Sequence, residues 1–246
     1  MAKQEKKEMS KVSKVVSAGL LAGVLMAGTP AAEAADVTVG ADIVSAYVFR
    51  GVTVNDEPVI QPSVLIEHES GVGFELWANY DLTDSGLENE FSEVDFILFY
   101  GIDVGDIGLE IGYTEYIEAI GDAFREGYIG ASYEFEGVEL GLTLYQGFSG
   151  SDETYIELGA GYGFEAAEGL TLGIEGSIAW GGKGATAAGK SGMHDYLVGI
   201  NAAFEVAEGL EVGAFFAHVG SLDSDVLPSS AVEEDFFGGI SVYYSF

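Results

Sequence analysis

Hydrophobic and polar residues alternate along most of the chain beyond residue 35. Val94, Phe96 and Leu98 fall on one side of a period-two pattern, while Glu93 and Asp95 fall on the other. The stretches VELGLTLYQG and LTLGIEGSIAW repeat this alternation. Successive side chains of a β-strand point to opposite faces, whereas helices repeat every 3.6 residues. No stretch after residue 34 follows the helical period, so the sequence predicts an all-β protein.

The alternating segments predict about twelve strands joined by two kinds of connection. Tight, glycine-containing turns alternate with longer links, which is typical of an antiparallel up-and-down transmembrane β-barrel. A soluble barrel or sandwich is the alternative, but twelve strands would enclose an interior too wide for ordinary side chains to fill. The strands are expected at residues 37–50, 59–69, 72–82, 91–103, 107–118, 126–136, 138–148, 153–165, 170–182, 193–205, 210–221 and 234–246.

The first 34 residues have the features of a secretory signal peptide. Five lysines precede an uncharged run from Val15 to Ala27, and the small-residue pattern Ala32-Glu33-Ala34 follows. A run of this length is too short for a helix that spans a bilayer, which needs ~20 residues. We therefore expect residues 1–34 to be removed after export through the Sec pathway, and residues 35–246 to form one barrel domain in the outer membrane of a Gram-negative bacterium.

The expected mature chain is strongly acidic. Removal of the signal peptide takes five of nine basic residues but only three of 41 acidic ones, which leaves a formal charge of −34. Nucleic-acid binding needs basic groups and is excluded on this basis. The whole chain is also 48% hydrophobic, so apolar and acidic side chains must lie on different faces. A lipid-facing apolar wall and a water-filled acidic lumen satisfy that requirement.

The stretch SAYVFRGVTVNDEPVIQPSVLIEHESGVGFELWANYDL, from Ser45 to Leu82, resembles the TorF family of porin-like outer-membrane proteins. The resemblance is carried by an S-x-Y-x-F-R-G segment, a later glutamine and a hairpin with a tryptophan. The matching residues are Ser45, Tyr47, Phe49, Arg50, Gly51, Gln61, Ser70, Gly71, Phe74 and Trp77. Thr53 and the spacing at Gly73 and Leu76 depart from the family pattern. The resemblance implies a porin-like barrel and names no solute.

Strand alternation predicts an acidic lumen. Arg50 is almost the only cation expected there, and an ion pair with Glu67 or Glu93 would hold the first long loop. Rings of carboxylates favour cations electrostatically, so we expect a narrow pore for passive diffusion of small cationic or neutral hydrophilic solutes. Lumen glycines such as Gly40 and Gly112 are expected to keep the bore free of side chains. The pore-lining candidates are Arg50, Asp42, Glu67, Glu75, Glu93, Asp95, Asp103, Glu110, Glu134, Glu139, Glu157, Glu175, Glu205 and Glu211.

The alternative is a non-conducting surface barrel whose acidic loops bind divalent ions or a partner. The loops at 81–90 and 222–233 carry several carboxylates, but neither has the spacing of an EF-hand. A folded loop at 183–192 or 222–233 that closed the bore would favour this alternative.

Two further motifs suggest chemistry but are better explained otherwise. Residues 184–191, GATAAGKS, fit the phosphate-binding pattern G-x-x-x-x-G-K-[ST], yet an alternating strand follows where a helix is required. His194 and His218 are expected at nearly opposite positions of neighbouring strands, close enough for metal binding or acid–base chemistry. No serine has a distinctive context beside them, so we predict neither an enzyme nor a cofactor or metal site.

The chain ends in ISVYYSF, an alternating strand with a terminal aromatic residue. In a closed barrel this strand pairs with the first one and leaves no free edge. It also resembles the signal read by the barrel-assembly machinery, so Ile240, Val242, Tyr244 and Phe246 are expected to act in assembly. The expected partners are outer-membrane lipid, that machinery and periplasmic chaperones, and the barrel is expected to be monomeric.

Overall fold

The computed structural model describes residues 35–83, 90–119, 123–148 and 153–246. The expected signal peptide, residues 1–34, lies outside them. Within the described part, no helix is long and apolar enough to span a membrane. Its only helical element is the short 3₁₀ turn η1 (Ser229–Ala231).

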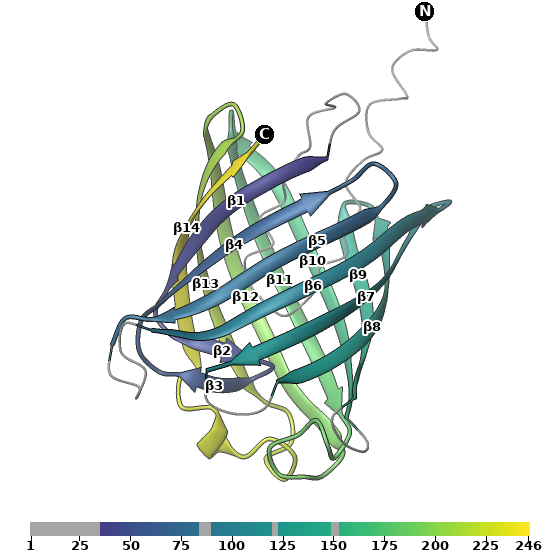
Figure 1. Cartoon of the computed structure of the whole chain (residues 1–246), viewed down its shortest axis with the longest axis vertical. Helices are drawn as coiled ribbons and strands as arrows, with labels where there is room; N and C mark the ends of the chain where they lie inside the picture. The colour runs from purple at the N-terminus through teal and green to yellow at the C-terminus, as the bar shows by residue number, and fades with distance from the viewer. Residues whose placement is uncertain (1–34, 84–89, 120–122, 149–152) are drawn as a thin grey trace, which may run out of the picture.

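Twelve antiparallel strands form a closed barrel (Figure 1). They are β1 (Asp36–Val44), β4 (Val59–Glu67), β5 (Val72–Asp81), β6 (Phe91–Val104), β7 (Ile107–Glu118), β8 (Phe124–Phe135), β9 (Val138–Gly147), β10 (Thr154–Ala167), β11 (Leu170–Gly181), β12 (Gly192–Ala207), β13 (Leu210–Ser221) and β14 (Phe236–Ser245). The prediction of an up-and-down barrel is confirmed, and eleven of the twelve strands lie within three residues of their expected bounds.

The first and last strands close the cylinder. β1 pairs with β14 in register from Thr38 opposite Ser245 to Val44 opposite Gly239. The backbone of Phe246 adds two hydrogen bonds to Val37, with N–O distances of 3.0 and 3.1 Å. The C-terminal strand is therefore not an exposed edge, as predicted from its alternation.

Tight turns lie at one end of the barrel and long connections at the other, hereafter the turn end and the loop end. The turn between β8 and β9 illustrates why the short connections form. Glu136 and Gly137 have φ values of 52° and 84°, and the flanking Phe135 and Val138 are paired. Positive φ at both central residues is the requirement of a type I′ turn, whose twist matches that of the flanking strands.

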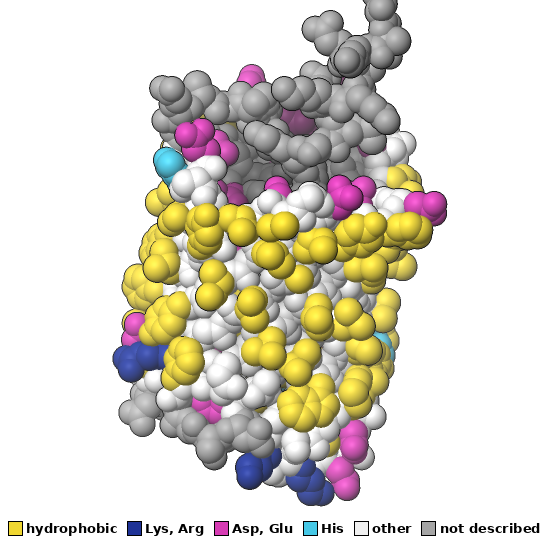
Figure 2. All heavy atoms as spheres, turned by 90° about the vertical axis from the view of Figure 1, so that its right-hand side faces the viewer, with side chains coloured by type: hydrophobic (Ala, Val, Ile, Leu, Met, Phe, Trp, Pro, Cys, Tyr) yellow, Lys and Arg dark blue, Asp and Glu magenta, His cyan; other side chains and the backbone are white. Residues whose placement is uncertain are grey.

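The outer wall is apolar. Hydrophobic side chains are spread over the barrel wall, while most visible acidic side chains lie at its two ends (Figure 2). Side chains such as Leu98, Ile129 and Ile200 are more than half exposed on this wall. Exposed apolar side chains in this number suit contact with lipid, not water.

The first long connection departs from the prediction. The first strand ends at Val44 instead of residue 50, and the chain then forms a separate hairpin from β2 (Tyr47–Phe49) and β3 (Val52–Asn55). We call residues 47–55 the lumen hairpin. In the sequence, Tyr47 continues the apolar alternation of β1, yet it is 4% exposed and lies inside the barrel. The period-two pattern therefore does not reveal that the chain changes direction after Val44.

Two lumen-facing glycines serve a purpose other than the one predicted. Gly112 pairs across the strands with Tyr128, and Gly40 pairs with Tyr243. A Cβ atom at either glycine would collide with the ring of that tyrosine. The glycines therefore make room for aromatic rings that lie against the wall, and do not leave the bore empty.

Candidate functional site: a constricted acidic lumen

The lumen hairpin is built around a two-residue turn. Arg50 and Gly51 have φ values of 48° and 77°, and Phe49 pairs with Val52 across them. This is again the pattern of a type I′ turn. Arginine is uncommon at positive φ and such a residue costs of the order of 1 kcal/mol or more, so contacts of its side chain must offset that cost.

One side of the hairpin packs against the barrel wall through apolar contacts. Tyr47 belongs to a buried cluster with Val44, Trp77 and Phe237. Its ring centroid lies 5.6 Å from that of Trp77, and its hydroxyl donates a hydrogen bond of 2.9 Å to Glu93. Burial, together with the charge of Glu93, raises the pKa of Tyr47 well above its usual value. Tyr47 therefore stays a neutral hydrogen-bond donor.

The tip of the hairpin is fixed to another part of the wall by Arg50. Nη1 and Nη2 donate hydrogen bonds of 3.0 and 2.7 Å to the two carboxylate oxygens of Glu126 on β8. The side chains of Arg50 and Glu126 are 11% and 1% exposed. Burial alone would lower the pKa of Arg50, but the charge and hydrogen bonds of Glu126 raise it above its usual value. The pair is thus a bidentate, charged contact that is shielded from water.

Aromatic rings and further polar groups extend this contact across the lumen. The guanidinium carbon of Arg50 lies 4.5 Å from the ring centroids of Tyr145 and Tyr155. The Tyr155 hydroxyl donates a hydrogen bond of 2.7 Å to Asp195, which lies 2.7 Å from Nδ1 of His194. The hairpin is therefore connected to β8, β9 and β10 directly and to β12 through Tyr155.

The last long connection, residues 222–235, folds over the hairpin. The hydroxyl oxygen of Thr53 accepts hydrogen bonds of 3.0 Å from the backbone N–H groups of Glu233 and Glu234. Leu227 is fully buried, and a Cβ atom on Gly51 would lie 2.9 Å from its side chain. This arrangement narrows the loop end of the bore and is the one expected to favour the non-conducting alternative.

Replacing Arg50 by alanine should destabilise the barrel by about 3 kcal/mol, because Glu126 would be left charged and buried without its partner. The measurement is the denaturant midpoint of the folded barrel in detergent. Arg125→Ala is the matched control, since Arg125 forms an exposed pair with Glu115 on the outer wall and exposed pairs contribute little. Equal shifts for the two variants would contradict a structural role for the Arg50–Glu126 pair.

Most of the predicted pore-lining acids share the lumen-facing side of their strands with buried side chains. A cavity on the turn-end side of the hairpin is lined by four of them, Asp42, Glu139, Glu157 and Glu175. Glu93 contacts the hairpin itself. Strand alternation puts the following on the same face: Glu67, Glu75, Asp95, Asp103, Glu110, Glu134, Glu205 and Glu211. That they line a conducting pore remains a prediction.

The expected partner of Arg50 is wrong, since Glu126 takes the place foreseen for Glu67 or Glu93. Sequence reasoning missed Glu126 as a site residue. It shares the lumen-facing side of β8 with Tyr128, so the alternation itself would have placed it in the bore. Tyr155 was also missed, and nothing in its local sequence indicates that its hydroxyl contacts Asp195.

The predicted pairing of His194 and His218 is also wrong. His218 lies opposite Val198 and contacts Phe236 on the outer wall. His194 is buried, and the pairing of β11 with β12 shifts register beside it. Asp195 lies 2.7 Å from Nδ1 of His194, and the two side chains are 5% and 1% exposed. The hydrogen bond from Tyr155 to Asp195 makes this pair part of the contacts around the lumen hairpin.

The other motifs have simple structural explanations. Residues 184–191 form a connection followed by β12, not by a helix, which excludes a phosphate-binding loop. Most of the acidic loop 81–90 lies outside the described residues. Within the described part of the chain, no group of three or more His, Cys, Asp or Glu side chains is arranged to hold a metal ion.

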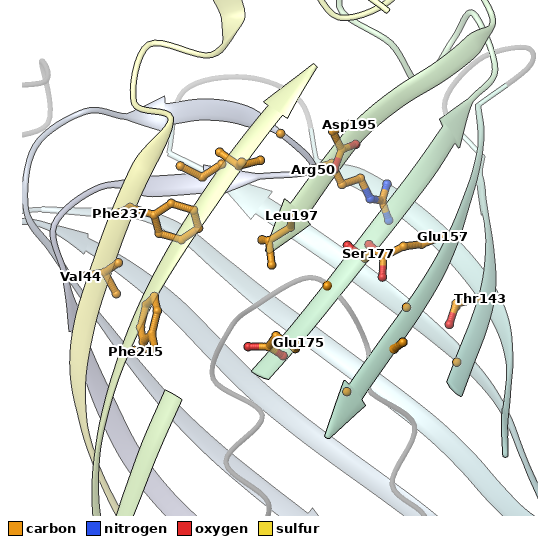
Figure 3. A pocket seen from close by; sticks show the side chains of 18 of the residues that line it. Val44, Arg50, Thr143, Glu157, Glu175, Ser177, Asp195, Leu197, Phe215 and Phe237 are labelled. Atoms are coloured by element: carbon orange, nitrogen blue, oxygen red, sulfur yellow. The ribbon is translucent and has the colours of Figure 1, made fainter. Parts of the chain in front are cut away.

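On the turn-end side of the hairpin, the lumen contains a cavity of about 110 Å³. Figure 3 shows Val44, Phe215 and Phe237 on one side of it, with Glu157 and Thr143 across from them. Arg50 and Asp195 lie at its upper edge in this view. The constriction and this cavity form the candidate site.

Comparison with known protein families places the chain. Residues 28–227 match the family described as bacterial protein of unknown function, Gcw_chp. The chain belongs to this family. No curated protein sequence matches it.

Several solved structures share the barrel. An outer-membrane channel from Pseudomonas putida F1 superposes with a TM-score of 0.58 at 12% identity, covering 89% of this chain and 97% of that one. The KdgM porin gives 0.54 at 10% identity, covering 86% and 99%. The NanC porin gives 0.51 at 9% identity, covering 86% and 98%. At these identities the likeness extends to the fold, which is that of outer-membrane barrels.

Proposed function

We propose that this Gcw_chp protein is a narrow outer-membrane channel for passive diffusion of small cationic or neutral hydrophilic solutes. The likeness of its barrel to solved outer-membrane channels supports this proposal, as does the apolar outer wall. The resemblance of Ser45–Leu82 to the TorF family agrees with it. Five residues of that pattern form the lumen hairpin or pack against it, namely Tyr47, Phe49, Arg50, Gly51 and Trp77. Gln61 lines the cavity.

The observation that carries the cation preference is a set of carboxylates facing one another near the turn end. Glu134 lies directly opposite Glu139, and Glu205 lies directly opposite Glu211. Like charges in directly opposed strand positions are destabilising. These opposed carboxylates therefore lower the stability of the barrel, but their negative potential concentrates cations at the entrance. That function would explain why the barrel has them.

The basic residues of the described chain do not cancel this potential. Arg50 is neutralised by Glu126, and Arg125 pairs with Glu115 on the outer wall. Lys183 and Lys190 lie exposed in the connection between β11 and β12. The lumen-facing charge is therefore negative on both sides of the constriction.

Selectivity in a planar bilayer tests this proposal. Under a KCl gradient, the reversal potential of the reconstituted barrel should have the sign of a cation-selective pore. The double variant Glu134→Gln/Glu139→Gln should move it measurably toward zero, because it removes one opposed pair of charges. The control Glu168→Gln/Glu208→Gln removes two carboxylates from the turns and should leave it nearly unchanged.

An anion-selective current would overturn the proposal, and so would equal shifts for the two double variants.

The second candidate function is a non-conducting barrel that binds a partner or ions through its loops. The folding of residues 222–235 over the lumen hairpin favours it. Absence of current with all loops intact would decide for that candidate.

A further inference from the structure

The cavity beneath the lumen hairpin has walls of two different chemistries. One wall is apolar and consists of side chains from β1, β12, β13 and β14, namely Val44, Leu197, Phe215, Val219 and Phe237. The facing strands β9, β10 and β11 contribute Thr143, Glu157, Glu175 and Ser177 (Figure 3). A solute that passes the hairpin therefore contacts an apolar surface and a surface that carries carboxylates at the same time.

One carboxylate of this cavity has a hydrogen-bond partner at only one of its two oxygen atoms. Asp42 is 2% exposed and lines the cavity. Its Oδ2 atom accepts a hydrogen bond from the Tyr243 hydroxyl, whereas Oδ1 has no hydrogen-bond partner among the described residues. A buried polar atom without a partner is costly, and an N–H donor from a solute would satisfy it.

The charge of the cavity is suited to a cation. Glu157 is 6% exposed and lines the cavity together with Glu175 on β11 and Asp195 on β12. Arg50 also reaches the cavity, but both of its Nη atoms donate to Glu126. The arginine is therefore already paired, while the carboxylates of the cavity outnumber it.

We propose that this cavity is a binding site for organic ammonium ions that carry a compact apolar group. The ammonium group binds Asp42, which lies on β1 beside the apolar wall, and the apolar group packs against Phe215 and Phe237. Glu157 on the facing wall adds to the negative potential of the cavity. The assignment deepens the proposed channel function by naming a class of solute, and its solute-passage aspect rests on that function. Binding itself can be measured without any current.

The test is calorimetric titration of the folded barrel in detergent with phenethylammonium. Two comparison compounds separate the two walls: ethylammonium lacks the aromatic group, and phenylacetate has the opposite charge. We expect phenethylammonium to bind with saturation and at least about tenfold more tightly than either comparison compound, because only it satisfies both walls.

Variants locate the site. Asp42→Asn should weaken phenethylammonium binding by about tenfold or more, since a charge-assisted hydrogen bond is lost. Phe215→Ala should weaken phenethylammonium but not ethylammonium. Asp106→Asn, in the turn between β6 and β7, is the matched control and should bind as the parent does. Glu157→Gln provides a second acid variant if Asp42→Asn folds poorly.

Three results would overturn the assignment: no saturable binding, equal binding of phenylacetate, or equal weakening by Asp106→Asn. None of them depends on conductance. A barrel that conducts K⁺ but does not bind phenethylammonium retains the proposed channel function and loses this site. A barrel that binds phenethylammonium without conducting retains the site and loses the channel.

Discussion

Removing the lumen hairpin will raise the conductance of the reconstituted barrel severalfold. The hairpin joins one wall through the Tyr47 cluster and another through the Arg50–Glu126 pair. Replacing residues 46–57 with a short Gly-Ser linker removes both contacts, while β1 and β4 keep their nine paired positions. Because the wall is a closed set of strand pairs, the barrel should still fold.

The matched control shortens a different connection. Replacing residues 184–189 with a short Gly-Ser linker trims the loop end but leaves the hairpin and Glu126 in place. Its single-channel conductance should stay close to that of the parent. The hairpin variant should remain cation-selective, since the opposed carboxylates near the turn end are unaffected.

The outcome separates the two candidate functions. A parent that conducts weakly and a hairpin variant that conducts strongly would identify the hairpin as the constriction of a channel. A silent parent and a conducting variant would identify it as a plug and favour the non-conducting barrel. Unchanged conductance on removal of the hairpin, or an equal increase in the control, would disprove its role as the narrowest point.

Deleting Phe246 should lower the yield of assembled barrel by a large factor while changing the stability of the barrels that form much less. The side chain is 68% exposed on the outer wall and stacks on Tyr244, so the folded state gains little packing from it. We therefore expect its main role during insertion, as part of a signal for the assembly machinery together with Ile240, Val242 and Tyr244. The readouts are the folded fraction in outer membranes and the denaturant midpoint.

Phe246→Ala refines this test because it keeps the two backbone hydrogen bonds to Val37. Phe135→Ala is the matched control, since Phe135 is a second exposed aromatic residue near the turn end with no place in the C-terminal signal. Equal losses of yield and stability, or an equal loss of yield in Phe135→Ala, would mean that Phe246 has only a structural role.

The barrel was predictable from the sequence because each of its strands has one face in contact with lipid and one in contact with the lumen. That environment imposes a strict period of two, as in Phe96, Leu98 and Tyr100, which all lie exposed on the outer wall. A tight turn at Glu136-Gly137 was equally predictable, since a glycine needs no distant partner to reverse the chain. Local physics determines these elements.

The constriction was not predictable for the same reason. Tyr47 and Phe49 continue the alternation of β1, and a pattern with period two does not distinguish a strand of the wall from a hairpin inside it. The decisive contact joins Arg50 to Glu126, 76 residues further along the chain. Nothing local selects Glu126 from the many acids on the lumen-facing side.

The histidine prediction failed for two reasons. The pairing of β12 with β13 is regular from Asp195 to Glu205 and puts Val198, not His194, opposite His218. The register of β12 against β11 shifts between the partners Ile178 and Trp180, and such irregularities redirect side chains. His194 then contacts Tyr155 inside the barrel, whereas His218 contacts Phe236 outside it.

The cross-strand pairs of glycine and tyrosine link the width of this barrel to its carboxylates. Where Gly112 faces Tyr128 and Gly40 faces Tyr243, the ring occupies space that a Cβ atom would otherwise fill. A glycine-to-alanine exchange at such a pair would turn the ring toward the axis and take its hydroxyl away from the carboxylate it contacts, which is Glu110 for Tyr128 and Asp42 for Tyr243. Homologous barrels can thus change the width of the lumen and the hydrogen bonding of one of its acids through a single methyl group.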